Sequence, residues 1–188
     1  MREPLLHFWA QTLLFFGLSA PALRAFRQVV RENPAREEAW STLAYLLAQK
    51  GEFSEAIPAF ERALALKPDD ASLAFNAAFA MQRAGDHERA MTLMQRAITL
   101  DAKLDRAWYG LGLSLAHVGR YEEAVAKFKQ AARLQPFNPY AGYQLAAVFA
   151  KLGRREELRA EYERVKEFDP KISALMRREF GIDDPDAR

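Results

Sequence analysis

Apolar side chains recur along the chain in a fixed order with a period of 34 residues. A glycine marks each period, and a small residue, a large apolar residue and a proline follow it at constant distances. The glycines are Gly17, Gly51, Gly85, Gly119 and Gly153. Self-similarity at a fixed period of this length is the signature of a repeat architecture, in which each unit buries its apolar face against the next.

Each period predicts a hairpin of two helices. Apolar residues at helical spacing precede every glycine, which suits the left-handed position just past a helix end. The small residues that allow close helix approach are Ala22, Ala56, Ala90 and Ala124, and the last unit departs from them with Leu158. The large residues that fill the space between units are Phe26, Phe60, Met94, Phe128 and Tyr162. Pro34, Pro68, Pro136 and Pro170 end the second helices, with Ala102 in the remaining unit.

One unit carries a specific resemblance: it reads Trp108-x2-Leu111-Gly112-x2-Leu115, then Ala124-x3-Phe128 and Pro136. In these residues it resembles the tetratricopeptide repeat. The resemblance implies an all-α fold, a right-handed α-solenoid of about five helical hairpins plus a C-terminal capping helix. The array is predicted over residues 1–172, with units at 3–36, 37–70, 71–104, 105–138 and 139–172. Residues 173–188 are predicted to form the capping helix and a frayed tail from Asp183.

Composition narrows the possible functions. The chain has no cysteine, which removes disulfides, thiol nucleophiles and thiolate metal sites. His7, His87 and His117 lie in three different units, and no two have the spacing of a helical metal pair. The 27 basic and 25 acidic residues are interspersed, which is typical of a solvated surface and not of a nucleic-acid footprint. We therefore expect no enzyme activity, no metal, no cofactor and no nucleic-acid partner.

The resemblance also implies a binding surface. In tetratricopeptide proteins the first helices of the units line a concave groove that binds a peptide or a partner protein. The positions that look into that groove are aromatic with a few polar groups, which suits peptide recognition. An aromatic at this position is also common in tetratricopeptide repeats of no known specificity, so these rings have packing as an alternative interpretation. The predicted peptide-binding residues are Tyr45, Phe75, Asn76, Phe79, Arg106, Tyr109, Tyr140 and Tyr143.

One known specificity of the family is disfavoured. Some relatives hold the C-terminal carboxylate of chaperones with a clamp of Lys, Asn, Asn, Lys and Arg. Those positions correspond here to Ser41, Tyr45, Asn76, Arg106 and Gly110. Only Asn76 matches, with Arg106 retaining the charge, so most of the required charge-assisted bonds are missing.

The N-terminal stretch, residues 5–23, is more apolar than any other first helix. Three interpretations of this stretch compete: a secretory leader, a transmembrane anchor and a first repeat. The repeat is favoured because Leu6, Trp9 and Ala10 fall in register with the later units. The large side chains Leu5, Phe8, Leu14, Phe15 and Phe16 exceed what one packing face needs. We expect this surplus to contact a second copy, a partner protein or a membrane surface.

These patterns together predict a scaffold or adaptor that binds a peptide or partner protein in the groove. The alternative is a membrane-associated or secreted assembly factor anchored through the apolar N-terminal segment. A cytoplasmic location is expected, and a secreted or membrane-associated one is the alternative.

Overall fold

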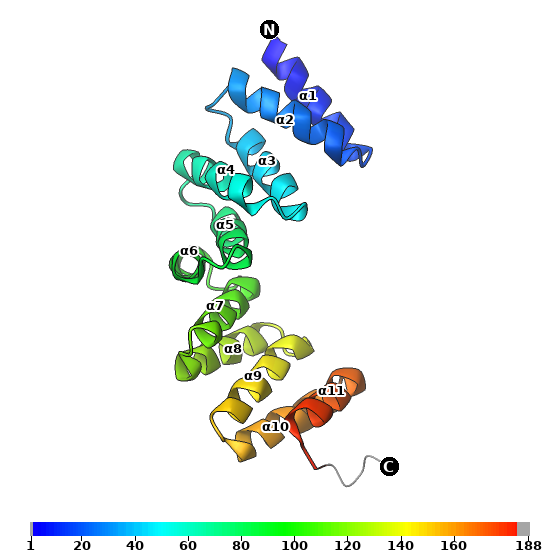
Figure 1. Cartoon of the computed structure of the whole chain (residues 1–188), viewed down its shortest axis with the longest axis vertical. Coiled ribbons are helices and arrows are strands. Elements are labelled where there is room, and N and C mark those ends of the chain that lie inside the picture. Colours follow the sequence, from blue (N-terminus) through cyan, green and yellow to red (C-terminus); the bar gives the residue numbers. More distant parts are fainter. Residues whose placement is uncertain (1, 184–188) are drawn as a thin grey trace. The chain divides into compact units, whose positions relative to one another are not determined.

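A computed structural model describes residues 2–183, and within that range the chain forms eleven helices and no strand (Figure 1). The prediction of an all-α solenoid ending in a capping helix is confirmed. The helices are α1 (Arg2–Phe15), α2 (Ser19–Glu32), α3 (Glu37–Gln49), α4 (Phe53–Leu66), α5 (Ala71–Arg83), α6 (His87–Leu100), α7 (Asp105–His117), α8 (Tyr121–Leu134), α9 (Pro139–Lys151), α10 (Arg155–Lys166) and α11 (Pro170–Phe180). The tail prediction concerns Asp183 to Arg188, and residues 184–188 lie outside the described range.

The contacts divide the chain into two compact units between Asp101 and Ala102. The N-terminal unit holds α1–α6 and the C-terminal unit holds α7–α11. In each unit, consecutive helices pack as hairpins: α1 with α2, α3 with α4 and α5 with α6 in the first, α7 with α8 and α9 with α10 in the second. The capping helix α11 packs on both α9 and α10.

The five periodic glycines end the first helix of each hairpin. Each has a positive φ, between 70° and 88°, a region that is costly for residues with a Cβ atom. The amide after the glycine donates to a carbonyl five residues back, as from Glu52 N to Leu47 O at 3.0 Å and from Asp86 N to Met81 O at 2.9 Å. This Schellman geometry satisfies helix-end carbonyls and turns the chain into the second helix.

Small residues bring the two helices of a hairpin together around a buried ring. In the hairpin α7–α8, a Cβ atom at Gly112 would lie 2.6 Å from the Phe128 ring, so the ring fills the space that a side chain would need. Phe26, Phe60 and Phe128 are all within 1% of complete burial. The predicted alternation of small and large positions is therefore the packing core of the hairpins.

Each proline or alanine that closes a hairpin leaves a carbonyl that the next hairpin binds. Trp40 Nε1 donates to Pro34 O at 3.0 Å, and Trp108 Nε1 donates to Ala102 O at 2.9 Å. Arg96 Nη2 donates to Pro68 O at 2.8 Å across 28 residues. These bonds satisfy carbonyl groups of the turns, and within the N-terminal unit they link each turn to the hairpin that follows it.

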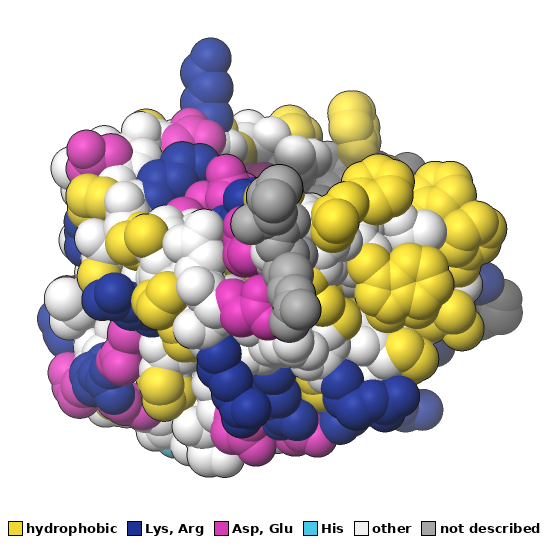
Figure 2. All heavy atoms as spheres, turned by 90° about the horizontal axis from the view of Figure 1, so that it is seen from above, with side chains coloured by type: hydrophobic (Ala, Val, Ile, Leu, Met, Phe, Trp, Pro, Cys, Tyr) yellow, Lys and Arg dark blue, Asp and Glu magenta, His cyan; other side chains and the backbone are white. Residues whose placement is uncertain are grey.

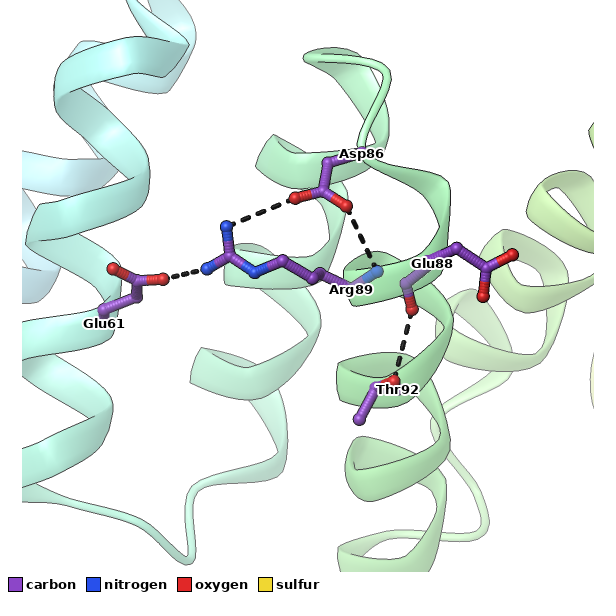
Figure 3. A network of polar contacts seen from close by, with 5 residues as sticks. All are labelled: Glu61, Asp86, Glu88, Arg89 and Thr92. Atoms are coloured by element: carbon purple, nitrogen blue, oxygen red, sulfur yellow. Dashed lines mark hydrogen bonds and ion pairs between the residues drawn. The ribbon is translucent and has the colours of Figure 1, made fainter.

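Ion pairs also link successive second helices. Arg89 contacts Glu61 on α4 and Asp86 at the start of its own helix (Figure 3). Arg27 pairs in the same way with Glu55, at 2.7 Å. Exposed pairs of this kind contribute at most about 1 kcal/mol each to stability. We therefore infer that their main role is to align successive second helices.

Replacing Asp70 with alanine is expected to destabilise the N-terminal unit by about 1 kcal/mol. Asp70 is the N-cap of α5, and its Oδ1 accepts from Leu73 N at 2.9 Å. Its pKa is lowered, chiefly by the hydrogen bond from Lys67 and then by that from Leu73 N. The stabilisation is therefore present above the unfolded-state pKa and is lost as pH falls through the lower folded value.

Urea denaturation at neutral and acidic pH measures this effect. Asp70→Asn is the matched control, because asparagine caps helices as well as aspartate does. A loss for Asp70→Asn as large as that for Asp70→Ala would contradict the capping role.

Candidate peptide-binding site

A pocket of about 190 Å³ lies in the C-terminal unit, between the first helices of two successive hairpins. We call it the α7–α9 pocket. It is lined by Asp105, Arg106, Tyr109, Ala131, Gln135, Asn138, Tyr140 and Ala141. Arg106, Tyr109 and Tyr140, three of the predicted groove residues, thus share one cavity although α7 and α9 are separate in sequence.

Tyr109 forms a fixed wall of this pocket. Its half-buried ring lies 5.7 Å, centroid to centroid, from the buried ring of Phe128. Burial raises the pKa of Tyr109, while a hydrogen bond with Gln144 acts in the opposite direction. The phenol is therefore neutral at physiological pH, and its position is fixed by packing before any ligand arrives.

Tyr140 and Arg106 form the exposed side of the pocket. Tyr140 is 58% exposed and sits in the first turn of α9, where Asn138 Oδ1 accepts from Tyr140 N at 3.0 Å. Arg106 is exposed in the first turn of α7. The pocket therefore offers a guanidinium, two tyrosine rings and the amides of Gln135 and Asn138, with the carboxylate of Asp105 beside them.

Tyr143 lies one turn further along α9 and contacts the capping helix. Its hydroxyl donates to Glu179 on α11, and its ring lies 5.5 Å from that of Phe180. The residue does not line the α7–α9 pocket. The sequence predicts a capping helix at the end of the array, but it does not predict that this helix contacts Tyr143.

Replacing Tyr143 with phenylalanine is expected to loosen α11 at neutral pH by removing its bond to Glu179, at a cost of about 1 kcal/mol. The hydrogen bond to Glu179 raises the pKa of Tyr143, followed by burial. In the wild type the stabilisation is present below the unfolded-state pKa and is lost as pH rises through the higher folded value.

Hydrogen exchange of the α11 amides measures this loosening. The wild type and Tyr143→Phe should differ at neutral pH and converge at strongly alkaline pH. Equal exchange in the two chains at neutral pH would contradict the bond.

The predicted groove residues of the N-terminal unit have mixed environments. Phe75 is only 8% exposed and stacks on Phe79 at 6.3 Å, so packing accounts for its position. Phe79 is 42% exposed, and Asn76 is half-buried. Tyr45 is 51% exposed, and its hydroxyl accepts from Gln49 Nε2 at 2.9 Å. Phe75, Tyr109 and Tyr143 share one position in the 34-residue repeat, and their rings have different environments.

A larger pocket, about 540 Å³, lies between α4 and α6 and was not predicted. Its charged residues include Glu61, Arg89 and Arg96. Arg89 is paired with Glu61 and Asp86 (Figure 3), and Arg96 donates to Pro68 O. None of the predicted groove residues lines this larger pocket, whereas three of them line the smaller α7–α9 pocket, which we therefore favour as the ligand site.

The predicted N-terminal surface is largely exposed. Leu5, Phe8, Phe15 and Phe16 are between 69% and 85% exposed, and hydrophobic side chains cluster on the face seen from above in Figure 2. Leu14 is half-buried and does not share this exposure. Trp9, which the register assigned to a packing column, is 56% exposed.

No cluster of metal ligands and no membrane-spanning helix lies in the part of the chain that the structure describes. Among residues 2–183, no group of three or more His, Asp or Glu side chains could hold a metal ion. None of the helices described combines the length and hydropathy that a membrane span requires.

Solved structures of known proteins share this fold at low sequence identity. A MamA structure superposes with a TM-score of 0.83 at 21% identity, covering 88% of this chain and 96% of its own. YrrB, described as a tetratricopeptide protein with an unusual peptide-binding site, gives 0.82 at 19% identity, with coverage of 92% and 90%. MamA from Desulfovibrio magneticus RS-1 gives 0.78 at 19% identity, with coverage of 94% and 96%.

Comparison of the sequence with known families identifies the family as well as the fold. No curated protein sequence matches the chain. Residues 22–141, more than half of the chain, match the model of one tetratricopeptide family. The match begins in α2 and ends in α9, so it spans both compact units and includes every residue that lines the α7–α9 pocket. The chain belongs to the family of the cytochrome c-type biogenesis protein H TPR domain.

Proposed function

We propose that the chain is a protein-interaction module that binds a peptide segment of a partner protein in the α7–α9 pocket. The observation that carries this proposal is the convergence of Arg106, Tyr109 and Tyr140, from two different hairpins, on one cavity. Family membership supports the general role, because tetratricopeptide repeats present their first helices as binding surfaces. We propose no catalytic role.

The chemistry of the pocket indicates the kind of peptide. Tyrosine rings supply broad contact area with little conformational entropy to lose, and their hydroxyls add hydrogen bonds. The guanidinium of Arg106 suits a carboxylate on the ligand. We therefore propose a ligand segment that places an apolar or aromatic side chain between the tyrosines and an acidic group at Arg106.

Selection from a random peptide library on the immobilised full chain tests this proposal. Peptides that bind the wild type should be enriched in Asp or Glu next to an apolar residue. Arg106→Glu should weaken the selected peptides about tenfold or more, because it replaces attraction with repulsion. Arg133→Glu is the matched control: it changes the net charge equally on exposed α8, outside the pocket. Equal weakening by both substitutions would contradict a specific role for Arg106.

A second candidate function follows from the exposed N-terminal side chains: membrane association, as part of a membrane-bound or secreted assembly factor. Phe8, Phe15 and Phe16 are the kind of side chain that inserts at a lipid interface. Sedimentation with vesicles of phosphatidylcholine and phosphatidylglycerol tests this alternative directly. It predicts that the chain pellets with the vesicles, and a chain that stays in the supernatant would contradict it.

A further inference from the structure

The outer face of α1 is an apolar helix surface that the described chain leaves uncovered. We define it as Leu5, Phe8, Trp9, Thr12, Phe15 and Phe16. Leu5 and Phe8 are each 71% exposed, and Phe15 is 85% exposed. These six residues lie within one arc of the helix, with the buried Ala10 opposite the arc and the buried Leu13 beside it.

The register shows that this is a helix-packing surface. Leu5, Trp9 and Thr12 occupy the positions that α3, α5 and α9 bury beneath the second helix of the preceding hairpin. All nine equivalent residues are at most 5% exposed. They are Ala39, Leu43 and Leu46 in α3, Leu73, Ala77 and Ala80 in α5, and Ala141, Leu145 and Val148 in α9. The outer face of α1 therefore continues the interface by which hairpins stack.

The same face differs from the stacking surface in width and bulk. Phe8 and Phe15 lie beside the stacking columns, at positions where α3 has Thr42 and Gln49. Trp9 is larger than the Leu or Ala found at its equivalents. The stacking columns of α3 and α5 hold only Ala and Leu, so the bulkier outer face of α1 suits a different helix from the one that covers α3 or α5.

Four of the six residues of this face are spaced symmetrically about residue 10. Leu5 and Phe15 lie five residues to either side of it, and Phe8 and Thr12 lie two residues to either side. When two such helices pair antiparallel across a two-fold axis, Leu5 of each faces Phe15 of the other. Phe8 of each then faces the small Thr12, so large residues oppose small ones, as at well-packed helix interfaces.

Polar groups do not oppose such a pairing. The hydroxyl of Thr12 donates to Phe8 O at 2.9 Å, which leaves its methyl group on the face. From Pro4 to Leu18 the sequence has no Asp, Glu, Lys or Arg, so two copies would meet without like-charge repulsion. Glu3, just outside this stretch, accepts from Arg36 Nη2 at 3.2 Å.

We propose that the outer face of α1 binds the same face of a second copy, with the two α1 helices antiparallel across a two-fold axis that crosses this face at the level of residue 10. Its aromatic side chains present on the order of 500 Å² of apolar surface per copy. Pairing buries on the order of 1,000 Å² in total, near the lower size limit of specific interfaces. The dimer is independent of the α7–α9 pocket, which lies in the other compact unit.

Light scattering of the full chain on size exclusion tests the dimer. The expected mass is twice the 21.4 kDa of the chain, falling to the monomer value on dilution. Phe8→Glu combined with Phe15→Glu should give a monomer with an unchanged helical circular dichroism spectrum, because both residues are exposed. Phe137→Glu, at an 82% exposed phenylalanine of the other unit, should leave the dimer intact. A monomeric wild type, or a dimer that survives the double substitution, would overturn the proposal.

Cysteine cross-linking tests the antiparallel register without interference, because the chain has no cysteine of its own. Under oxidation, Leu5→Cys chains mixed with Phe15→Cys chains should form the disulfide-linked dimer in higher yield than either variant alone. Identical positions would lie about 15 Å apart in the proposed pair, at 1.5 Å rise per residue. Preferential linking within either single-variant sample would overturn this register, and vesicle binding by a wild-type monomer would assign the face to lipid instead.

Discussion

Replacing Phe128 with alanine is expected to destabilise the C-terminal unit by about 3–5 kcal/mol, the largest effect on stability that the structure predicts. The Phe128 side chain is fully buried, and it fills the space beside Gly112 where α7 and α8 approach. Collapse of the helices into the vacated space is restricted, because both belong to a hairpin whose end is fixed by Gly119. The variant therefore leaves a cavity as well as losing apolar contacts.

Urea denaturation followed by Trp108 fluorescence measures this loss in the unit concerned. Replacing Trp9 and Trp40 with phenylalanine leaves Trp108, on α7, as the single reporter. Phe137→Ala is the control, since that ring is 82% exposed and should cost far less. A loss below about 1 kcal/mol for Phe128→Ala would show that the ring does not support the hairpin.

Replacing Tyr109 with leucine and Tyr140 with alanine in one chain is expected to weaken a selected peptide by about 30-fold or more. Tyrosines that anchor a ligand commonly contribute more than about 1 kcal/mol each, so the pair contributes about 2 kcal/mol, which is roughly 30-fold in affinity at about 1.4 kcal/mol per tenfold. Leucine at position 109 retains an apolar contact with Phe128, so the loss should come from the missing rings and hydroxyls and not from unfolding.

Fluorescence anisotropy with a labelled peptide measures the affinity, and circular dichroism checks the fold. Tyr121→Ala, at the start of α8 and outside the lining of the pocket, is the control and should leave the affinity nearly unchanged. An affinity of the double variant within about twofold of the wild type would place the peptide elsewhere on the chain.

The repeat and its hairpins could be predicted because they depend on local chemistry. The periodic glycines adopt positive φ whatever surrounds them, and the Ala and Phe columns pack within their own hairpins. The all-α solenoid followed from these features, and the structure and the family match confirm it.

The environments of individual site residues could not be predicted in the same way, since they depend on which neighbour covers each position. Tyr143 has the same register as Tyr109, but α11 folds back and supplies Glu179 to its hydroxyl. Phe75 also shares that register and is buried against Phe79. Trp9 occupies a packing column yet stays exposed, because no preceding helix covers α1 in the described chain. Periodicity assigns a position in the unit, whereas exposure is set by the surrounding helices.

Three predicted residues, Arg106, Tyr109 and Tyr140, share a cavity. Phe75 and Tyr143 instead pack against neighbouring rings. Gln135 and Asn138, which also line the pocket, were not predicted. They lie at the end of α8 and in the turn before α9, outside the first helices to which the resemblance pointed. Whether residues of such a turn line a pocket depends on how successive hairpins stack.

Amide chemical-shift mapping of a selected peptide on the isotope-labelled chain tests the central claim most directly. The account predicts that the largest shifts fall on Arg106, Tyr109, Asn138 and Tyr140, around the α7–α9 pocket, while α4 and α6 stay unchanged. Shifts confined to α4 and α6, or to Tyr45 and Phe79 on the first helices of the N-terminal unit, with the pocket unaffected, would contradict it.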